Sequence, residues 1–288
     1  MPSVKDLRER IRSLKNTQQI TKAMKQVAAA KIRRAELAQK QARPYAQTLS
    51  EMLRDLMASV SSVDHPFMKL GVQGAPMGLI VMTADKGLAG AFNSNITRAA
   101  EAYVREHRDV AYYSVGIKAR NFVRRAGVEN HPTWALNAAP KIESARELAR
   151  RVTDDFVAGN ISGITIVSSK LISMLSQRPE TRKLVPIERG ALAATEQRQG
   201  PKGSVEFAPS PEAVLSRLLP KYLEFTLFSA MLETDAAFFA AQLLAMNNAT
   251  ENAGKLIDEL TIAMNNARQA AITKELLEIV GGAEALTG

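Results

Sequence analysis

The stretch FAAQLLAMNNATENAGKLIDELTIAMNNARQAA, residues 239–271, decides the fold, because apolar and small side chains recur in it in alternating steps of four and three. These positions, the C-terminal seam, are Phe239, Leu243, Met246, Thr250, Ala253, Ile257, Leu260, Met264, Ala267 and Ala271. A narrow stripe sustained over several heptads is typical of a helix that pairs with another helix in a coiled coil. The pattern predicts a long helix that starts at Pro211, kinks near Pro220 and ends at Gly281 and Gly282.

The N-terminal segment carries a matching stripe, and no proline interrupts it between Pro2 and Pro44. Its expected seam positions are Val4, Leu7, Ile11 and Leu14 and, after a polar interval over 16–19, Ile20, Met24, Val27 and Ile32. We expect the helix to continue past Pro44 to about residue 60. Two helices that each carry an apolar stripe can bury both stripes by packing against each other antiparallel.

Between the two helices the periodicity changes to that of a small α/β region. Short β-branched or aromatic runs predict strands at 77–83, 110–115 and 164–169, with a further strand at 183–188. Helices are expected at 95–107, 117–126 and 142–158, and a loop at 195–204. Alternating strands and helices indicate a mostly parallel sheet. The expected fold is a long antiparallel coiled coil (1–60 and 209–286) plus a small α/β domain (77–190).

The composition excludes several classes of protein. The chain has 288 residues, of which 46% are hydrophobic and 23% charged, as in a soluble globular protein. It has no cysteine, which excludes disulfides, thiolate metal sites and cysteine nucleophiles. The longest nearly uncharged stretch, 236–246, is far shorter than the ~20 residues that span a bilayer. The charged N-terminus does not resemble a secretory signal. We therefore expect no direct membrane span.

The net charge of +9 is concentrated at one end of the chain. Residues 1–43 contain twelve lysines and arginines against three acidic residues, so the remaining residues are neutral overall. Such an asymmetry favours an acidic or polyanionic partner for this segment, with a merely solvated helix face as the alternative.

Residues that carry chemistry are sparse. The sequence TADKGLAGAFN, residues 83–93, forms a glycine-bearing loop between a strand and a helix, with a turn expected at Asp85, Lys86, Gly87 and Gly90. It fits neither established phosphate-binding glycine motif, so a tight turn is favoured over a nucleotide site. The three histidines are isolated in sequence, which argues against a metal site or a catalytic triad. We expect no catalytic residue, no metal and no cofactor.

The terminal segments and the middle loop together resemble the gamma subunits of F-type ATP synthases, in their bacterial-like form. The resemblance rests on LRERIRSLKNTQQITKAM (7–24), AMNNATENA (245–253) and NARQAAITKELLEIV (266–280), and the loop is similar to the family's SDRGLCGGFN. Departures from the common family residues occur at Ala84, Lys86, Ala89, Ala91, Phe238, Phe239, Gln242 and Met264.

The resemblance implies a rotor shaft that performs no bond chemistry itself. Its expected partners are the hexamer of alpha and beta subunits, the epsilon subunit and the ring of c subunits. It would then lie peripherally at the cytoplasmic face of the bacterial plasma membrane. The matching motifs place rotor–stator contacts at Lys22, Met24, Lys25, Arg268 and Gln269.

Two other classes of function remain as alternatives. A nucleic-acid-binding coiled coil would use the basic segment for phosphate contacts, but there the zipper follows the basic block, whereas here the apolar stripe runs through it. A nucleotide-binding α/β enzyme would use the glycine loop and would leave the two long helices unexplained. We therefore expect no nucleic acid among the partners, and co-purification would separate these interpretations.

Overall fold

The computed structural model describes residues 3–59, 65–69, 71–107, 109–137, 140–187 and 210–287. The elements in chain order are α1 (Val4–Ser59), η1 (Pro66–Met68), β1 (Met77–Met82), α2 (Phe92–Glu106), β2 (Val110–Val115), α3 (Ile117–Arg125), β3 (Thr133–Trp134), α4 (Lys141–Val157), β4 (Gly163–Ser173), β5 (Ser176–Val185) and α6 (Pro211–Thr287). They form two compact units. The coiled-coil unit comprises 1–28 and 242–288, and the α/β unit comprises 29–241, so α1 and α6 contribute to both.

The α/β unit is built on a five-stranded sheet in the order β3-β2-β1-β4-β5. The strands β1, β2, β3 and β4 pair in parallel, and β5 pairs antiparallel with β4. The expectation of a mostly parallel sheet beside two long terminal helices is therefore confirmed. Alternate residues of β1 face opposite sides, and each side has its own core.

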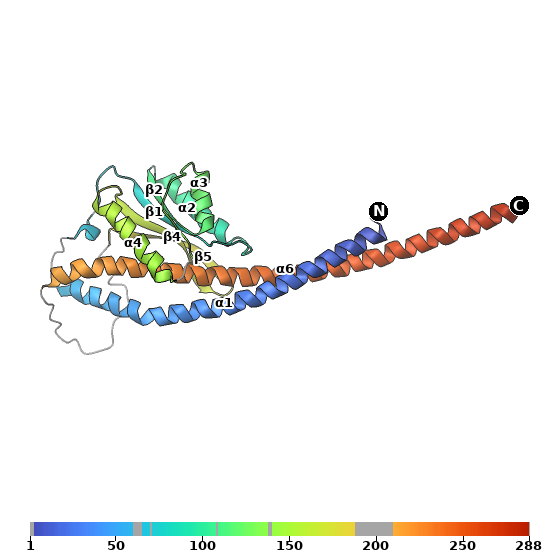
Figure 1. Cartoon of the computed structure of the whole chain (residues 1–288), viewed down its shortest axis with the longest axis horizontal. Helices are drawn as coiled ribbons and strands as arrows, with labels where there is room; N and C mark the ends of the chain where they lie inside the picture. Colours follow the sequence, from blue (N-terminus) through green and yellow to red (C-terminus); the bar gives the residue numbers. More distant parts are fainter. Residues whose placement is uncertain are drawn as a thin grey trace. The chain divides into compact units, whose positions relative to one another are not determined.

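One core lies between the sheet and the helices α4 and α6, with the C-terminal part of α1. The other core lies between the sheet and the pair α2 and α3, which lie together in Figure 1. Both helical layers bury apolar faces against the central strand β1, whose residues from Gly78 onward are buried. Because helices cover both faces, the central strands read as continuous apolar runs rather than as alternating ones.

Three strands differ from the expectation. Strand β4 extends past the expected end at 169 to Ser173. Of the run expected at 183–188, residues 183–185 form the end of a longer strand, β5, which begins at Ser176 and includes Pro179. Its largely polar sequence suits an edge strand with one unpaired side, where proline is tolerated. The short strand β3 at Thr133–Trp134 was not expected; two residues carry no periodicity, and its pairing with Ser114 and Val115 is a long-range contact.

The C-terminal helix is longer than the glycines suggested. Helix α6 continues through Gly281 and Gly282 to Thr287, so the expected end was wrong. Neither glycine has the positive φ that a helix-ending glycine adopts. The helices α1 and α6 also run through Pro44 and Pro220. The loop expected at 195–204 lies outside the described residues.

The coiled-coil unit is antiparallel, as expected, because later residues of α1 contact earlier residues of α6. Thr21 pairs with Thr250, where the two Oγ1 atoms are 2.8 Å apart, and Lys25 pairs with Asn247, where Nζ lies 2.6 Å from Oδ1. Along α6, Met246, Ala253 and Ile257 are buried, and Leu243, Thr250, Leu260, Met264 and Ala267 are half-buried, while Ala271 is exposed.

The seam of α1 follows a different path from the expected one. Leu7 and Ile11 are buried and Leu14 is half-buried, but Ile20 and Val27 are 60% and 54% exposed. The positions that continue the helical period beyond Leu14 are Gln18 (half-buried), Thr21 and Ala28 (both buried). The expectation failed at Ile20 and Val27 because it followed the apolar residues of the sequence. The helix geometry instead continues the seam of α1 through polar residues.

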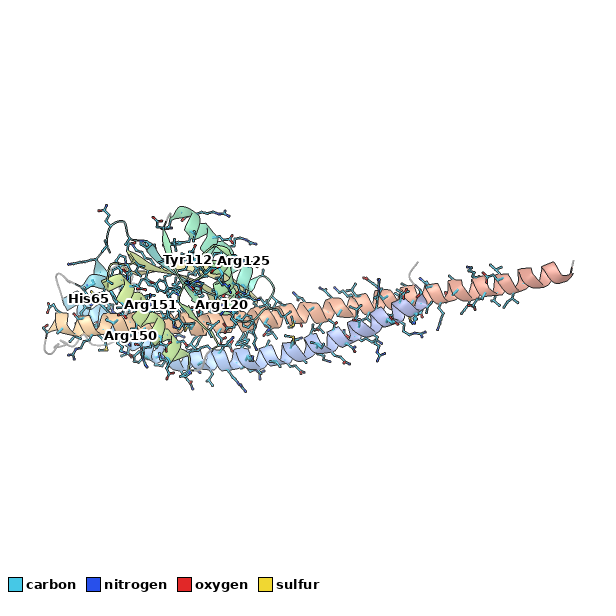
Figure 2. The ribbon with its side chains drawn as sticks, turned by 45° about the horizontal axis from the view of Figure 1, so that its top comes forward. His65, Tyr112, Arg120, Arg125, Arg150 and Arg151 are labelled. Atoms are coloured by element: carbon cyan, nitrogen blue, oxygen red, sulfur yellow. The ribbon has the colours of Figure 1, made fainter. Side chains whose placement is uncertain are left out.

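A buried tyrosine joins the sheet to α4 in the α/β unit. The Tyr113 hydroxyl donates to Oδ2 of Asp155 at 2.7 Å, and the same oxygen accepts from Nε of Arg151 at 2.8 Å; Arg151 is labelled in Figure 2. Burial alone would raise the pKa of Asp155, but the hydrogen bonds from Tyr113, Arg151 and Asn160 outweigh burial and lower it. The carboxylate of Asp155 therefore stabilises the folded state in its charged form.

We expect Tyr113→Phe to lower the free energy of unfolding by about 1.5–3 kcal/mol at neutral pH, because it removes a hydrogen bond to a charged group. The lowered pKa of Asp155 means that this contribution is present at neutral pH and is lost as the pH falls through the folded-state pKa. Urea unfolding of both forms at several pH values measures the difference. If the difference in free energy of unfolding between the two forms stayed constant down to the most acidic pH, the partner of Tyr113 would not be a charged carboxylate.

Candidate functional site

The predicted contact residues of α1 lie on its exposed surface. Lys22 and Lys25 are exposed, and Met24 between them is half-buried. The ammonium of Lys25 donates to Oδ1 of Asn247, whose Nδ2 donates to Glu251 at 2.6 Å. Lys25 is therefore held against α6. Lys22 has no hydrogen-bond or ion-pair partner among the described residues, so its charge is available to a partner.

An outer stripe on α1 adds Ile20 and Val27 to Met24, which is the one residue of the stripe that the sequence predicts as a contact. Ile20, Met24 and Val27 are spaced by four and three residues and thus share one helical face. With Ile20 and Val27 more than half exposed, this face offers apolar area, while Lys22 points to another side of the helix. The apolar pattern of the sequence predicts these residues in the seam instead.

A polar layer fixes the pairing of α1 with α6 next to this face. Thr250 donates from Oγ1 to the carbonyl of Met246 at 2.7 Å, and its hydroxyl also contacts that of Thr21. Nε2 of Gln18 donates to the Thr250 carbonyl at 3.4 Å. A Cβ added at Gly254 would lie 3.1 Å from that same nitrogen. Polar groups at seam positions specify the register of a coiled coil, because shifting the register leaves them unpaired.

Helix α6 is exposed on every side over residues 268–282. Every residue of this range is exposed, including Arg268 and Gln269. Large apolar side chains nevertheless continue along it, and we call them the terminal stripe: Ile272, Leu276, Leu277, Ile279 and Val280, which are 49–68% exposed. An uncovered row of large apolar side chains marks a surface that a partner covers.

The loop after β1 is tied to itself by one asparagine. Oδ1 of Asn93 accepts from the Ala84 N–H at 3.1 Å, and its Nδ2 donates to the Lys86 carbonyl at 3.2 Å. Leu88 has a positive φ of 62° and is 61% exposed. Gly90 also has a positive φ, of 57°. A residue other than glycine rarely adopts this conformation, so the surrounding bonds hold Leu88 in place.

The carboxylate of Asp85 caps the start of α3. It accepts from the N–H of Ile117, at the start of α3, at 3.1 Å, and from the N–H of Asn137 at 2.8 Å. Helix N-termini attract anions, and here the chain supplies its own. Lys86 is exposed, and no heavy atom lies within 4 Å of a Cβ added at Gly87. The geometry is that of a structural turn.

The histidines do not form a common site. Nδ1 of His65 accepts from the Phe67 N–H at 3.1 Å, and burial lowers the pKa of His65. The ring of His107 stacks on Tyr103 with ring centroids 3.9 Å apart, and His131 contacts the Val128 carbonyl. Within the described ranges, no three His, Cys, Asp or Glu side chains gather in a way that could hold a metal ion.

Among the described residues, one helix is long and apolar enough to cross a membrane by length and composition alone. It is α6 over Glu212–Gly282, and 67% of its most apolar window is buried in the protein. Packing against the sheet and against α1 accounts for that apolar character.

The fold defines a class of protein: a chain with two long terminal helices that pair in one unit, and an α/β unit with a mostly parallel sheet. A family profile described as ATP synthase matches residues 3–286. The chain is 45% identical to the ATP synthase gamma chain of Desulforamulus reducens, over 99% of this chain and all of that one. It is 43% identical to the gamma chain of Phenylobacterium zucineum, with the same coverage.

Solved structures agree on the fold. A chain of the Euglena gracilis mitochondrial ATP synthase (OSCP/F1/c-ring) matches with a TM-score of 0.67 and 18% identity, over 98% of this chain and 94% of that one. A chain of the Tetrahymena thermophila central stalk/c-ring matches with a TM-score of 0.60 and 22% identity, over 80% and 99%. The chain belongs to the ATP synthase gamma chain family.

Proposed function

We propose that this chain is the central rotor shaft that couples proton flow through the membrane c-ring to ATP synthesis at the beta-subunit sites, by rotating within the alpha/beta hexamer. The observation that carries the proposal is the terminal stripe at the exposed end of α6. Such a surface is suited to turning inside an apolar sleeve formed by other subunits. The exposed cations Lys22 and Lys25 of α1 complement acidic loops on those subunits.

The partners proposed are the alpha and beta subunits, the epsilon subunit and the c-ring. Support for them comes from gamma chains of bacteria that align over their full length, and from folds shared with rotor chains of complexes that contain F1 and a c-ring. As part of such an assembly, the chain would lie peripherally at the cytoplasmic face of the bacterial plasma membrane.

The proposed role is non-catalytic. The loop after β1 fits neither established phosphate-binding glycine motif, and its Asp85 is used to bond two backbone N–H groups of the chain itself. A shaft instead acts through contacts that differ in strength among alternative conformations of the subunits around it. Its energetic contribution is therefore a coupling free energy between ring rotation and nucleotide affinity.

A rotation assay tests the proposal. Because the chain has no cysteine, Lys118→Cys introduces a single labelling site in the α/β unit for attachment of a bead. In a complex with immobilised alpha and beta subunits, ATP should drive rotation of the bead in one direction. The chain alone should hydrolyse no ATP. A stationary bead in a complex that hydrolyses ATP at the normal rate would overturn the proposal.

A charge-reversal variant tests the cationic face. We expect Lys22→Glu with Lys25→Glu to leave the complex assembled but to lower proton pumping per ATP by about two- to fivefold, since an exposed ion pair contributes about 0–1 kcal/mol. High salt should reduce the defect. Pumping and ATP hydrolysis are measured in reconstituted vesicles.

The matched control is Lys40→Glu with Arg43→Glu, two exposed cations further along α1. It makes the same change in charge and should pump normally. Lys22→Glu alone keeps the bond from Lys25 to Asn247 and isolates the contribution of the free cation. Normal pumping per ATP in the double variant at low salt would show that these cations are only a solvated face.

A further inference from the structure

A buried carboxylate lies on α6 inside the α/β unit. Asp235 is only 6% exposed, and its Oδ2 lies 3.1 Å from Nζ of Lys141, the first residue of α4. Its Oδ1 is inaccessible to solvent and has no hydrogen-bond partner among the described residues. The ion pair joins α6 to α4 through two residues that are 94 positions apart in the sequence.

This ion pair does not add to stability in a simple way. Burial raises the pKa of Asp235, while Lys141 and Lys31 oppose that effect and Asp85 adds to it. The charged form therefore carries a desolvation cost that is only partly offset. Replacing a buried ion pair with apolar side chains often leaves the stability of a protein unchanged or raises it. The replacement removes the directional contact by which the ion pair fixes the positions of its two residues.

Large buried side chains surround Asp235 on the surface of α6. They stand three or four residues away, at Met231, Leu232, Phe238 and Phe239. Phe238 packs on Phe92, and the Nζ of Lys31 lies over Phe239. Apolar contacts of this kind are non-directional, whereas a buried ion pair leaves its charges unpaired when one helix shifts against the other, so the pair specifies a position that apolar packing defines less sharply.

We infer that Asp235 is a positioning residue whose bond to Lys141 fixes the register of α6 against the start of α4. A second ion pair, from Nε of Arg146 to Glu224 at 3.1 Å, connects the same helices, but its arginine is 57% exposed and holds the register more weakly. In a rotor the register would keep α6 from sliding or turning within the α/β unit under torque. That consequence rests on the proposed function, whereas the register itself does not.

Distance measurements between spin labels test the register directly. With Glu147→Cys on α4 and Ser216→Cys on α6, both exposed positions, the full chain should give one narrow distance distribution. Asp235→Leu and the isosteric Asp235→Asn should broaden it or add a second distance, without lowering the Tm. The exchange Asp235→Lys with Lys141→Asp should restore the narrow distribution. An unchanged distribution in Asp235→Leu and Asp235→Asn would overturn the inference, as would broadening that appears only with a lowered Tm.

The matched control is an ion pair on the outer surface of α4. Arg150 and Asp154 lie 3.9 Å apart with side chains 84% and 67% exposed, and Arg150 is labelled in Figure 2. Asp154→Asn should leave the distance distribution unchanged, and equal broadening there would count against a special role for Asp235.

In the assembled complex, Asp235→Leu should lower pumping per ATP at normal ATP hydrolysis. A wild-type shaft that does not rotate would overturn the proposed function while leaving the distance result standing.

Discussion

Replacing Ile11 with aspartate is expected to unfold the coiled-coil unit, whereas the same replacement at Ile20 should leave it folded. Ile11 is 8% exposed in the seam and Ile20 is 60% exposed on the outer face of the same helix. Burying the isoleucine side chain contributes about 1.5–3 kcal/mol, and a carboxylate left in the seam adds a desolvation penalty. We expect a loss of more than about 3 kcal/mol for Ile11→Asp and of less than about 1 kcal/mol for Ile20→Asp.

Circular dichroism melts of the full chain, followed at the helical band, measure the difference. Because both variants introduce the same charge on the same helix, helix propensity and net charge are matched between them. Similar melts for the two variants would mean that the seam does not pass through Ile11. A larger loss of stability for Ile20→Asp than for Ile11→Asp would show that the seam passes through Ile20, as the apolar pattern of the sequence indicates.

The contrast between these two isoleucines shows what the sequence could and could not predict. The C-terminal helix was predictable because its small and apolar residues keep one period from Phe239 to Ala267. On α1 the true seam passes through Gln18 and Thr21, whose polar groups are satisfied by Thr250 on the other helix. That partner lies more than two hundred residues away, so the local pattern could not reveal it.

The same reasoning applies to the sheet. The strands β1 and β2 were predictable because burial on both faces makes them continuously apolar or aromatic. The edge strand β5 needs no such composition, and the two residues of β3 depend on pairing with β2 and on the packing of Trp134 against the core. The glycine loop was recognised as a turn, but the role of Asp85 at the start of α3 depends on contacts that only the folded chain creates.

For the candidate site, the family resemblance placed residues that physics alone would not have selected. Lys22, Arg268 and Gln269 are ordinary exposed side chains, and their contact role remains a prediction. Asp235 shows the reverse limit. In the sequence Asp235 looks like an ordinary solvated acid of a long helix, and only its burial beside Lys141 sets it apart.

The second large effect is expected at Gly116, the residue before α3. Its φ of 90° and ψ of 147° lie in a region that is essentially restricted to glycine. A Cβ there would lie 2.1 Å from the carbonyl oxygen of Thr83, which is backbone and cannot rotate away. We expect Gly116→Ala to lower the free energy of unfolding of the α/β unit by about 3–5 kcal/mol, combining backbone strain with overpacking. Denaturant unfolding measures the loss.

Two other glycines separate these causes. Gly127 has a φ of 87° but no heavy atom within 4 Å of an added Cβ, so Gly127→Ala should cost only the backbone strain of about 1–3 kcal/mol. Gly87 has neither constraint, and Gly87→Ala should be neutral or slightly stabilising. Equal losses at Gly116 and Gly127 would show that the contact with Thr83 relaxes at no cost. A larger loss at Gly116 means that the tight approach of the β1 loop to α3 holds Asp85 at the start of that helix.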